Sequence, residues 1–211
     1  MKIVCAVLLL AVCIDVYSQS SEDVNINNRA VELMDDEQYK EALPYLDELV
    51  TRDSISTIYR HNRAVTLFNL KKYKEALADY EILSTAVPEE SEYLFQIGNA
   101  YEQLDSAQLA IDFYTKAIQL ENDKFLYFFK RGTILLHEGR FKEAENDFNE
   151  SLFLNPRHDN SLHNRGIARY KMGQSRKACQ DWCVANELGN PYSASHVKAN
   201  CSMFDPCKLK K

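Results

Sequence analysis

Small and large apolar side chains recur along this chain with a period of 34 residues. Alanine marks the period at five points, and a small residue stands twelve positions before and a large residue four positions after each alanine. The small residues are Ala30, Ala64, Gly98, Gly132 and Gly166. The alanines are Ala42, Ala76, Ala110, Ala144 and Ala178. The large residues are Leu46, Tyr80, Tyr114, Phe148 and Trp182. Pro88 and Pro156 lie twelve residues beyond their alanine, where a helix must end. The period predicts a unit of two helices, in which small residues allow close approach and the large residue fills the space between units.

Composition agrees with a helical globular protein. The chain has 211 residues, of which 45% are hydrophobic and 27% charged, and this composition excludes a disordered or collagen-like chain. Six Gly and five Pro favour long regular elements over a β fold with many turns. A net charge of -6 without any basic stripe excludes a nucleic-acid partner.

The N-terminus differs from the rest of the chain. Lys2 is followed by twelve apolar residues, Ile3 to Ile14, a run too short to span a bilayer as a helix. Val16 and Ser18 supply the tolerated residues before a cleavage point. The pattern predicts a secretory signal peptide over residues 1–18, and hence an exported protein that is periplasmic or secreted.

Two other interpretations of the N-terminus remain. The apolar run is also compatible with a buried N-terminal helix. Residues 10–13 resemble a bacterial lipobox, which would anchor a lipoprotein through Cys13, although Val12 is a poor residue at that point.

Removal of the signal leaves four cysteines, all within the last 33 residues: Cys179, Cys183, Cys201 and Cys207. An even number in an oxidising compartment indicates disulfides. Cys179 and Cys183 are four residues apart, so on a helix they share a face and each can meet a partner from one following segment. A zinc site with His196 and free buried thiols remain as alternatives, although the spacings are not those of common zinc sites.

The periodic residues resemble the tetratricopeptide repeat (TPR), whose small, aromatic and proline positions fall at these offsets. The resemblance covers five units, 23–56, 57–90, 91–124, 125–158 and 159–192, with phrases such as HNRAVTLFNLKKYKEALADY and KRGTILLHEGRFKEAENDF. It implies an all-α, right-handed α-solenoid of about five helix-turn-helix units over residues 19–192. The first unit departs most, with Ser54 where proline is expected and with Pro44, which is tolerable only if the second helix begins near Tyr39.

The C-terminal part, ACQDWCVANELG and the segment closing in Cys201, resembles exported TPR proteins of Bacteroidetes-type bacteria. That resemblance implies a capping helix and a Cys-containing tail over residues 191–211, with a disulfide between Cys179 and Cys201. Cys183 and Cys207 are extra to the pattern and are left to pair with each other. A capping helix from about Pro191 to Asn200 would cover the apolar face that the last repeat leaves open.

The sequence offers no catalytic or cofactor motif. The glycines all have structural places in the repeats, and neither GxGxxG nor GxxxxGK[ST] occurs. The five His never form HExxH, and no Ser stands in a GxSxG turn. We therefore expect a protein that is not an enzyme and that has no catalytic residues, no cofactor and no metal site.

A second stripe on the first helix of each unit, at positions 2, 5, 9 and 12, lines the concave groove in TPR proteins. The resemblance implies a partner groove made by His61, Val65, Phe68, Phe95, Asn99, Glu102, Phe129, Thr133, Leu136, His163, Ile167 and Tyr170. Such a trough would take an extended or helical segment of a protein or peptide partner, with Phe95 and Phe129 as anchors. The alternative is that Phe95 and Phe129 pack against the adjoining unit.

The groove excludes one class of partner. Cytosolic TPR chaperone receptors clamp a carboxylate with charged residues; here Asn62 and Asn164 match the middle residue of that clamp, but its Lys and Arg positions are not filled. We therefore predict a protein-interaction scaffold or adaptor of the bacterial envelope. A small-ligand or peptidoglycan-fragment binding protein that uses the same groove is the alternative.

Overall fold

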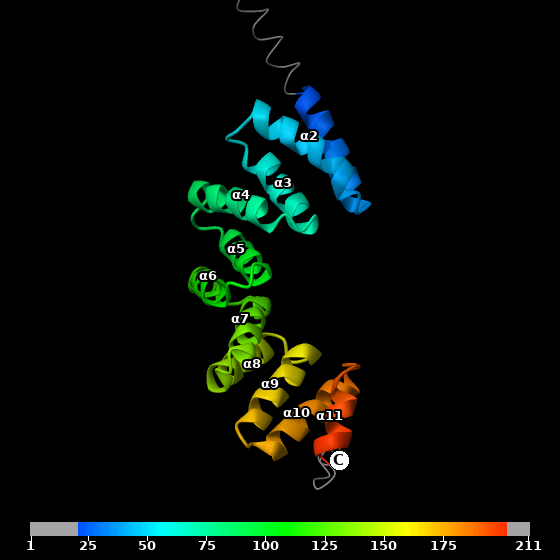
Figure 1. The fold of residues 1–211 in the computed structure, drawn as a ribbon, viewed down its shortest axis with the longest axis vertical. Coiled ribbons are helices and arrows are strands. Elements are labelled where there is room, and N and C mark those ends of the chain that lie inside the picture. The colour runs from blue at the N-terminus through cyan, green and yellow to red at the C-terminus, as the bar shows by residue number, and fades with distance from the viewer. Residues whose placement is uncertain (1–20, 202–211) are drawn as a thin grey trace, which may run out of the picture. The chain divides into compact units, whose positions relative to one another are not determined.

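The computed structural model describes residues 21–201, and within this range the chain is helical with no strand. A helix over residues 21–35 comes first. It is followed by α2 (Tyr39–Arg52), α3 (Thr57–Asn69), α4 (Tyr73–Ala86), α5 (Ser91–Gln103), α6 (Ala107–Leu120), α7 (Phe125–His137), α8 (Phe141–Leu154), α9 (Asp159–Lys171), α10 (Ser175–Glu187) and α11 (Ser193–Asn200) (Figure 1). Consecutive helices pack as pairs, as in the predicted solenoid. The predicted signal peptide and Cys13 lie outside the described residues.

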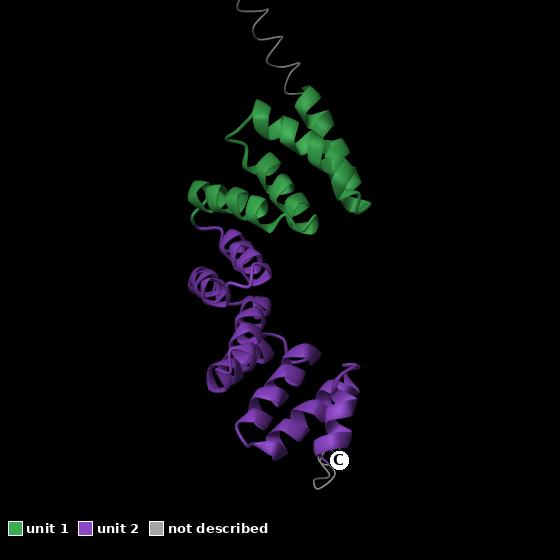
Figure 2. Cartoon of the chain, viewed as in Figure 1, with its two compact units in different colours: residues 1–88 green, residues 89–211 purple. Residues whose placement is uncertain are grey.

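The chain divides into two compact units, residues 1–88 and residues 89–211 (Figure 2). The first unit holds the first two helix pairs. Its core at the first pair is built on Ala30 and Ala42, which are fully buried where the two helices meet, with Leu33, Leu46 and Leu49 around them. Helix α2 begins at Tyr39 and continues through Pro44.

The second unit contains the pairs α5–α6, α7–α8 and α9–α10, followed by α11. Two glycines show why the small position is small. A Cβ on Gly98 would stand 2.6 Å from the ring of Tyr114, and one on Gly166 would stand 2.5 Å from the indole of Trp182. Both distances are shorter than real Cβ contacts, so the large residue of each repeat occupies the space that the small residue leaves.

The turn inside each helix pair places one residue in the left-handed region. Gly139 and Gly173 have positive φ angles of 74° and 77°, and each lies two residues before the second helix of its pair. Lys71 and Asp105 occupy the equivalent turns with φ angles of 61° and 54°, and so does Glu37 with 58°. Three of these turns therefore hold a side chain in a conformation that favours glycine.

Helix α11 covers the end of the last repeat. Asn190, which is buried, accepts hydrogen bonds from the backbone N–H groups of Tyr192 and Ser193, and its amide donates to Asp159 Oδ2 at 3.1 Å. These bonds fix the start of α11 against the start of α9. Val197 packs into the apolar cluster that contains Ala178 and Trp182.

A disulfide joins Cys179 of α10 to Cys201 at the end of α11, with the two Cα atoms 5.6 Å apart and both residues buried. Cys183 is also disulfide-bonded. Its expected partner, Cys207, lies outside the described residues. Within the described part of the chain, no helix is long and apolar enough to cross a bilayer.

Candidate interaction surface

The predicted groove positions lie on the first helix of each pair: α3 in the first unit, and α5, α7 and α9 in the second. In the first unit His61, Val65 and Phe68 are half-buried. The ring of His61 approaches that of Tyr80 edge-on at 6.4 Å, and Phe68 meets Tyr73 at 5.2 Å. The side chains of His61 and Phe68 therefore pack within the α3–α4 pair, and only part of their surface is exposed to solvent.

In the second unit, polar contacts connect α5, α7 and α9 along the same face. Lys130 of α7 forms an ion pair with Glu102 of α5, with 3.1 Å between Nζ and Oε2. The amide of Asn164 on α9 donates to Thr133 Oγ1 on α7 at 3.4 Å. The three helices thus form one continuous surface. We call it the A-helix face, because α5, α7 and α9 are the first (A) helices of their pairs.

The α5 part of the A-helix face is a polar network. The hydroxyl of Tyr114 lies 2.7 Å from Glu102 Oε2 and 2.8 Å from Asn99 Oδ1, and Asn99 donates to the amide oxygen of Gln96. Burial, and then the charge of Glu102, raise the pKa of Tyr114 above its ordinary range, so the phenol stays protonated and donates. Asn99 and Glu102 are therefore held in fixed orientations at the surface.

The structure corrects the prediction that Phe95 anchors a partner. Phe95 is only 3% exposed, and its ring stacks on Tyr127 at 4.6 Å and lies against Tyr114 at 5.4 Å. It therefore connects two successive repeats as part of the core, which was the alternative for this residue.

Leu136 and His163 are also buried, which removes them from the predicted groove surface. Leu136 belongs to the core cluster of the second unit. His163 is covered by α11, where its Nδ1 lies 2.9 Å from Ser193 Oγ. Burial and the neighbouring His196 lower the pKa of His163, which favours the neutral imidazole.

The remaining predicted residues of the second unit do reach solvent. Phe129 is half-buried, with its ring edge-on to His158 at 4.7 Å, and Thr133 and Ile167 are half-buried as well. Tyr170 is the most open of them, at 42% exposed, beside the ring of Trp182. The exposed part of the A-helix face is therefore polar on α5 and largely apolar on α7 and α9.

A row of arginine–aspartate pairs was missed in the sequence. Arg63, Arg131 and Arg165 each make two parallel hydrogen bonds to an aspartate 16 residues later, with N–O distances between 2.7 and 3.0 Å. The partners are Asp79, Asp147 and Asp181. Each arginine also reaches the preceding repeat, at Asp47, Thr115 and Asn149. The sequence could have indicated these pairs, because an Arg and an Asp 16 residues apart recur in register with the 34-residue period.

One serine–histidine contact resembles the pairs that occur in hydrolases. His158 Nδ1 lies 2.7 Å from Ser161 Oγ, but Ser161 is fully buried and its hydroxyl also meets Ser151 Oγ at 2.8 Å. A hydroxyl closed off from solvent cannot attack a substrate; the bond between Ser161 and Ser151 instead joins the start of α9 to α8. Among the described residues, no three His, Cys, Asp or Glu side chains are grouped to hold a metal ion.

Comparison with known proteins agrees with this architecture. Residues 30–129 match the family described as the N-terminal TPR repeats region of Psidin. The structure superimposes on YrrB, "a TPR protein with an unusual peptide-binding site", with a TM-score of 0.68 and 22% identity, covering 82% of this chain and 90% of YrrB. The chain has the fold of a TPR repeat protein. Proteins of the TPR fold are generally non-enzymatic scaffolds that bind protein or peptide partners.

Other proteins are similar to this chain over different lengths. MamA from Desulfovibrio magneticus RS-1 superimposes with a TM-score of 0.73 and 14% identity, covering 79% of this chain and 94% of that structure. DnaJ homolog subfamily C member 7 of Mus musculus is 30% identical over 99 residues, which are 47% of this chain and 20% of that protein. The matched segment of this chain therefore spans about one fifth of that relative's length.

Proposed function

We propose that this TPR protein is an exported scaffold of the bacterial envelope, which binds an extended segment of a protein partner on the A-helix face of α5, α7 and α9. The observation that carries the proposal is the continuity of this face, where Lys130 and Asn164 each hydrogen-bond to the preceding first helix. The exposed part of this surface is polar on α5 and largely apolar on α7 and α9.

The chemistry of the face suits an extended peptide. Side-chain amides such as Asn99 and Asn164 can donate to and accept from the main chain of a bound segment, which offers one donor and one acceptor at almost every residue. Phe129, Ile167 and Tyr170 can receive its apolar side chains. The described peptide-binding site of YrrB gives a precedent in a protein of the same fold.

Affinity capture from envelope extracts tests this function. The mature chain and a variant with Ile167→Ala and Tyr170→Ala should recover different amounts of the same partner, and the variant should recover roughly tenfold less because two apolar contacts are removed. Phe153→Ala is the matched control, because Phe153 is 80% exposed and lies on α8. This helix is the second of its pair and carries none of the groove positions. Equal recovery by all three proteins would contradict binding on the A-helix face.

The exported location has its own test. Cleavage at the predicted site should give a mature N-terminus at Gln19 without an acyl group, as measured by intact mass and N-terminal sequencing. A lipid-bearing N-terminus at Cys13 would support an anchored lipoprotein. An intact Met1 on protein from the native source would contradict export by this route.

A further inference from the structure

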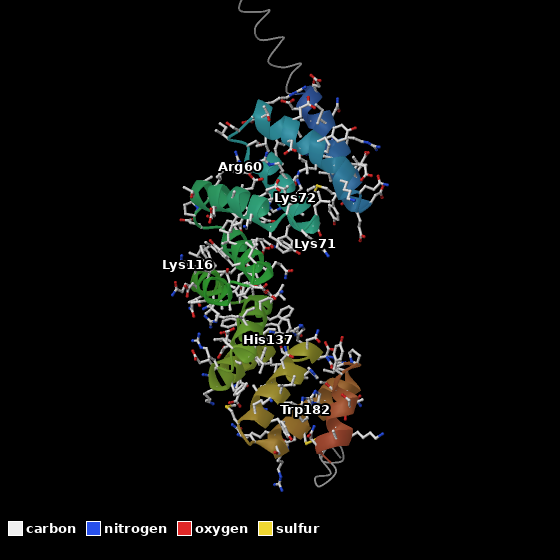
Figure 3. All side chains as sticks on the ribbon, viewed as in Figure 1. Arg60, Lys71, Lys72, Lys116, His137 and Trp182 are labelled. Atoms are coloured by element: carbon white, nitrogen blue, oxygen red, sulfur yellow. A yellow bond between two sulfur atoms is a disulfide. The ribbon has the colours of Figure 1, made fainter. Side chains whose placement is uncertain are left out.

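The three aspartates of the arginine–aspartate pairs differ in how many guanidinium groups they bind. Asp79, Asp147 and Asp181 hold equivalent positions in their repeats, and all are 3–5% exposed. Asp79 is bonded by Arg63 and also by Arg60, the residue labelled in Figure 3, with 2.9 Å between Arg60 Nη1 and Asp79 Oδ1. In the same way, Asp181 is bonded by Arg165 and by a second guanidinium from Arg169, at 2.8 Å.

Asp147 receives only one guanidinium. Arg131 donates to both of its oxygens, at 2.7 and 2.8 Å, and no second arginine reaches it. The positions equivalent to Arg60 and Arg169 are held in this repeat by Phe128 and Leu135, which are apolar. Burial raises the pKa of Asp147 above its ordinary value; the hydrogen bonds and charge of Arg131, and more weakly the charge of Arg140, offset that effect only in part.

A cavity of about 300 Å³ opens beside Asp147, between α6, α7 and α8. Leu135 and Ile111 are among its lining residues. One repeat later, Arg169 stands at the position of Leu135 and Glu145 at the position of Ile111. Arg169 and Glu145 form an ion pair, with 2.9 Å between Nε and Oε1. The cavity therefore lies where the next repeat places its second guanidinium. Glu143 and Asn146 also line it.

We propose that this cavity binds the guanidinium group of an arginine side chain presented by a protein partner. The carboxylate of Asp147 accepts two hydrogen bonds and has room for a third, as Asp79 and Asp181 show. Ile111 and Leu135 would pack against the aliphatic part of the incoming side chain. Guanidinium is favoured over ammonium because both equivalent aspartates use it and because its planar fork matches a carboxylate.

Arg140 is the competing occupant from within the chain. It lines the same cavity, but its guanidinium makes two hydrogen bonds to Glu143, at 2.7 and 2.8 Å, and none to Asp147. Arg140 directly precedes α8 and Glu143 lies three residues later in its first turn, so this pair is satisfied locally. The cavity thus stays open in the structure.

Titration of the mature chain with Nα-acetyl-arginine amide, followed by NMR at the Arg131 side-chain Nε–Hε group and the Asn146 amide, tests the proposal. The arginine derivative should shift both signals saturably, and its neutral isostere, Nα-acetyl-citrulline amide, should bind at least roughly tenfold more weakly. Acetyl-Gly-Arg-Gly amide should bind more tightly than methylguanidinium, because a protein segment adds contacts. Equal effects of arginine and citrulline would overturn the site, and equal binding of the peptide and methylguanidinium would overturn the assignment to a protein side chain.

Two variants complete the test without unpairing Arg131. Ile111→Glu combined with Leu135→Arg rebuilds the Arg169 arrangement inside the cavity and should abolish probe binding, with circular dichroism and thermal unfolding as checks that the chain is folded. Arg140→Gln should leave probe binding unchanged. Binding that appears only in Arg140→Gln would identify Arg140 as the occupant and overturn the proposal, as would undiminished binding to a folded double variant.

Discussion

The imidazole of His196 on α11 lies nearly parallel to the indole of Trp182 on α10, with ring centroids 4.5 Å apart and an angle of 23° between the planes. Trp182 is fully buried, and its indole N–H donates to the carbonyl oxygen of His163 at 3.1 Å. It is also the one tryptophan of the sequence. Its fluorescence therefore reports on the contact between the last repeat and the capping helix.

Acid should loosen the capping helix. His163 has a lowered pKa in the folded protein, because it is buried and faces His196, so the unfolded state binds the proton more readily. Stability from this group is complete above the unfolded value of about 6.5 and decreases as the pH falls below it. The charge of Asp159 on α9 opposes this trend, because it raises the pKa of His163, whereas His196 on α11 lowers it further.

Trp182 emission recorded between pH 8 and pH 5 measures this effect. The wild-type emission should shift to longer wavelength on acidification, as α11 separates from Trp182. His163→Gln, which keeps a hydrogen-bonding group near Ser193, should reduce the pH dependence. An emission spectrum that stays constant over this range would contradict the assignment to His163.

Loss of the disulfide between Cys179 and Cys201 should destabilise the C-terminal end. The bond closes a span with a sequence separation of 22 residues. On the chain-entropy model, replacing both cysteines by alanine costs about 3 kcal/mol of unfolding free energy. Urea unfolding followed by Trp182 fluorescence gives the value, and a change below about 1 kcal/mol would show that packing of α11 holds the cap by itself.

Phe95→Ala should lower stability rather than partner binding. The side chain is buried between Tyr114 and Tyr127, and its removal leaves a cavity that costs about 3–5 kcal/mol. Phe129→Ala, at a half-buried position, should cost less and should weaken partner recovery. Thermal and denaturant unfolding of both variants provide the comparison, and a Phe95→Ala variant as stable as the wild type would return this residue to the groove.

The turns offer a stabilising change. Lys71 has a positive φ angle of 61° at the position that glycine holds in later repeats. Lys71→Gly should therefore raise the unfolding free energy by about 0.5–1 kcal/mol, whereas Gly139→Ala should lower it by about 1 kcal/mol. Urea unfolding of the two variants should show shifts of opposite sign; a destabilised Lys71→Gly would indicate that the lysine side chain makes a contact that outweighs the backbone strain.

The 34-residue period was enough to predict the helix pairs, because the small and large positions report directly on packing between neighbouring helices. Gly98 against Tyr114 and Gly166 against Trp182 are such contacts. The period could not tell which groove positions reach solvent. Position 5 is buried at Phe95, where Tyr127 stacks on it, and half-buried at Phe129, where the neighbour is His158.

The cavity beside Asp147 was also beyond the sequence. The spacing of Arg131 and Asp147 is visible there, but its meaning depends on Arg60 and Arg169, which approach the equivalent aspartates from different positions. Only the folded structure shows that a second guanidinium binds the aspartate in both repeats, from Arg60 in one and from Arg169 in the other. The exposed part of the A-helix face likewise depends on which side chains the next repeat covers.

Site-specific photo-crosslinking tests the central claim, that a partner segment lies on the A-helix face, most directly. A photoreactive phenylalanine is placed at Tyr170, the most exposed groove residue, or at Phe153, which is 80% exposed on α8. Irradiation of cells that export each variant should give a partner adduct at Tyr170 and none at Phe153. An adduct at Phe153 alone, or equal adducts at both positions, would contradict binding on the A-helix face.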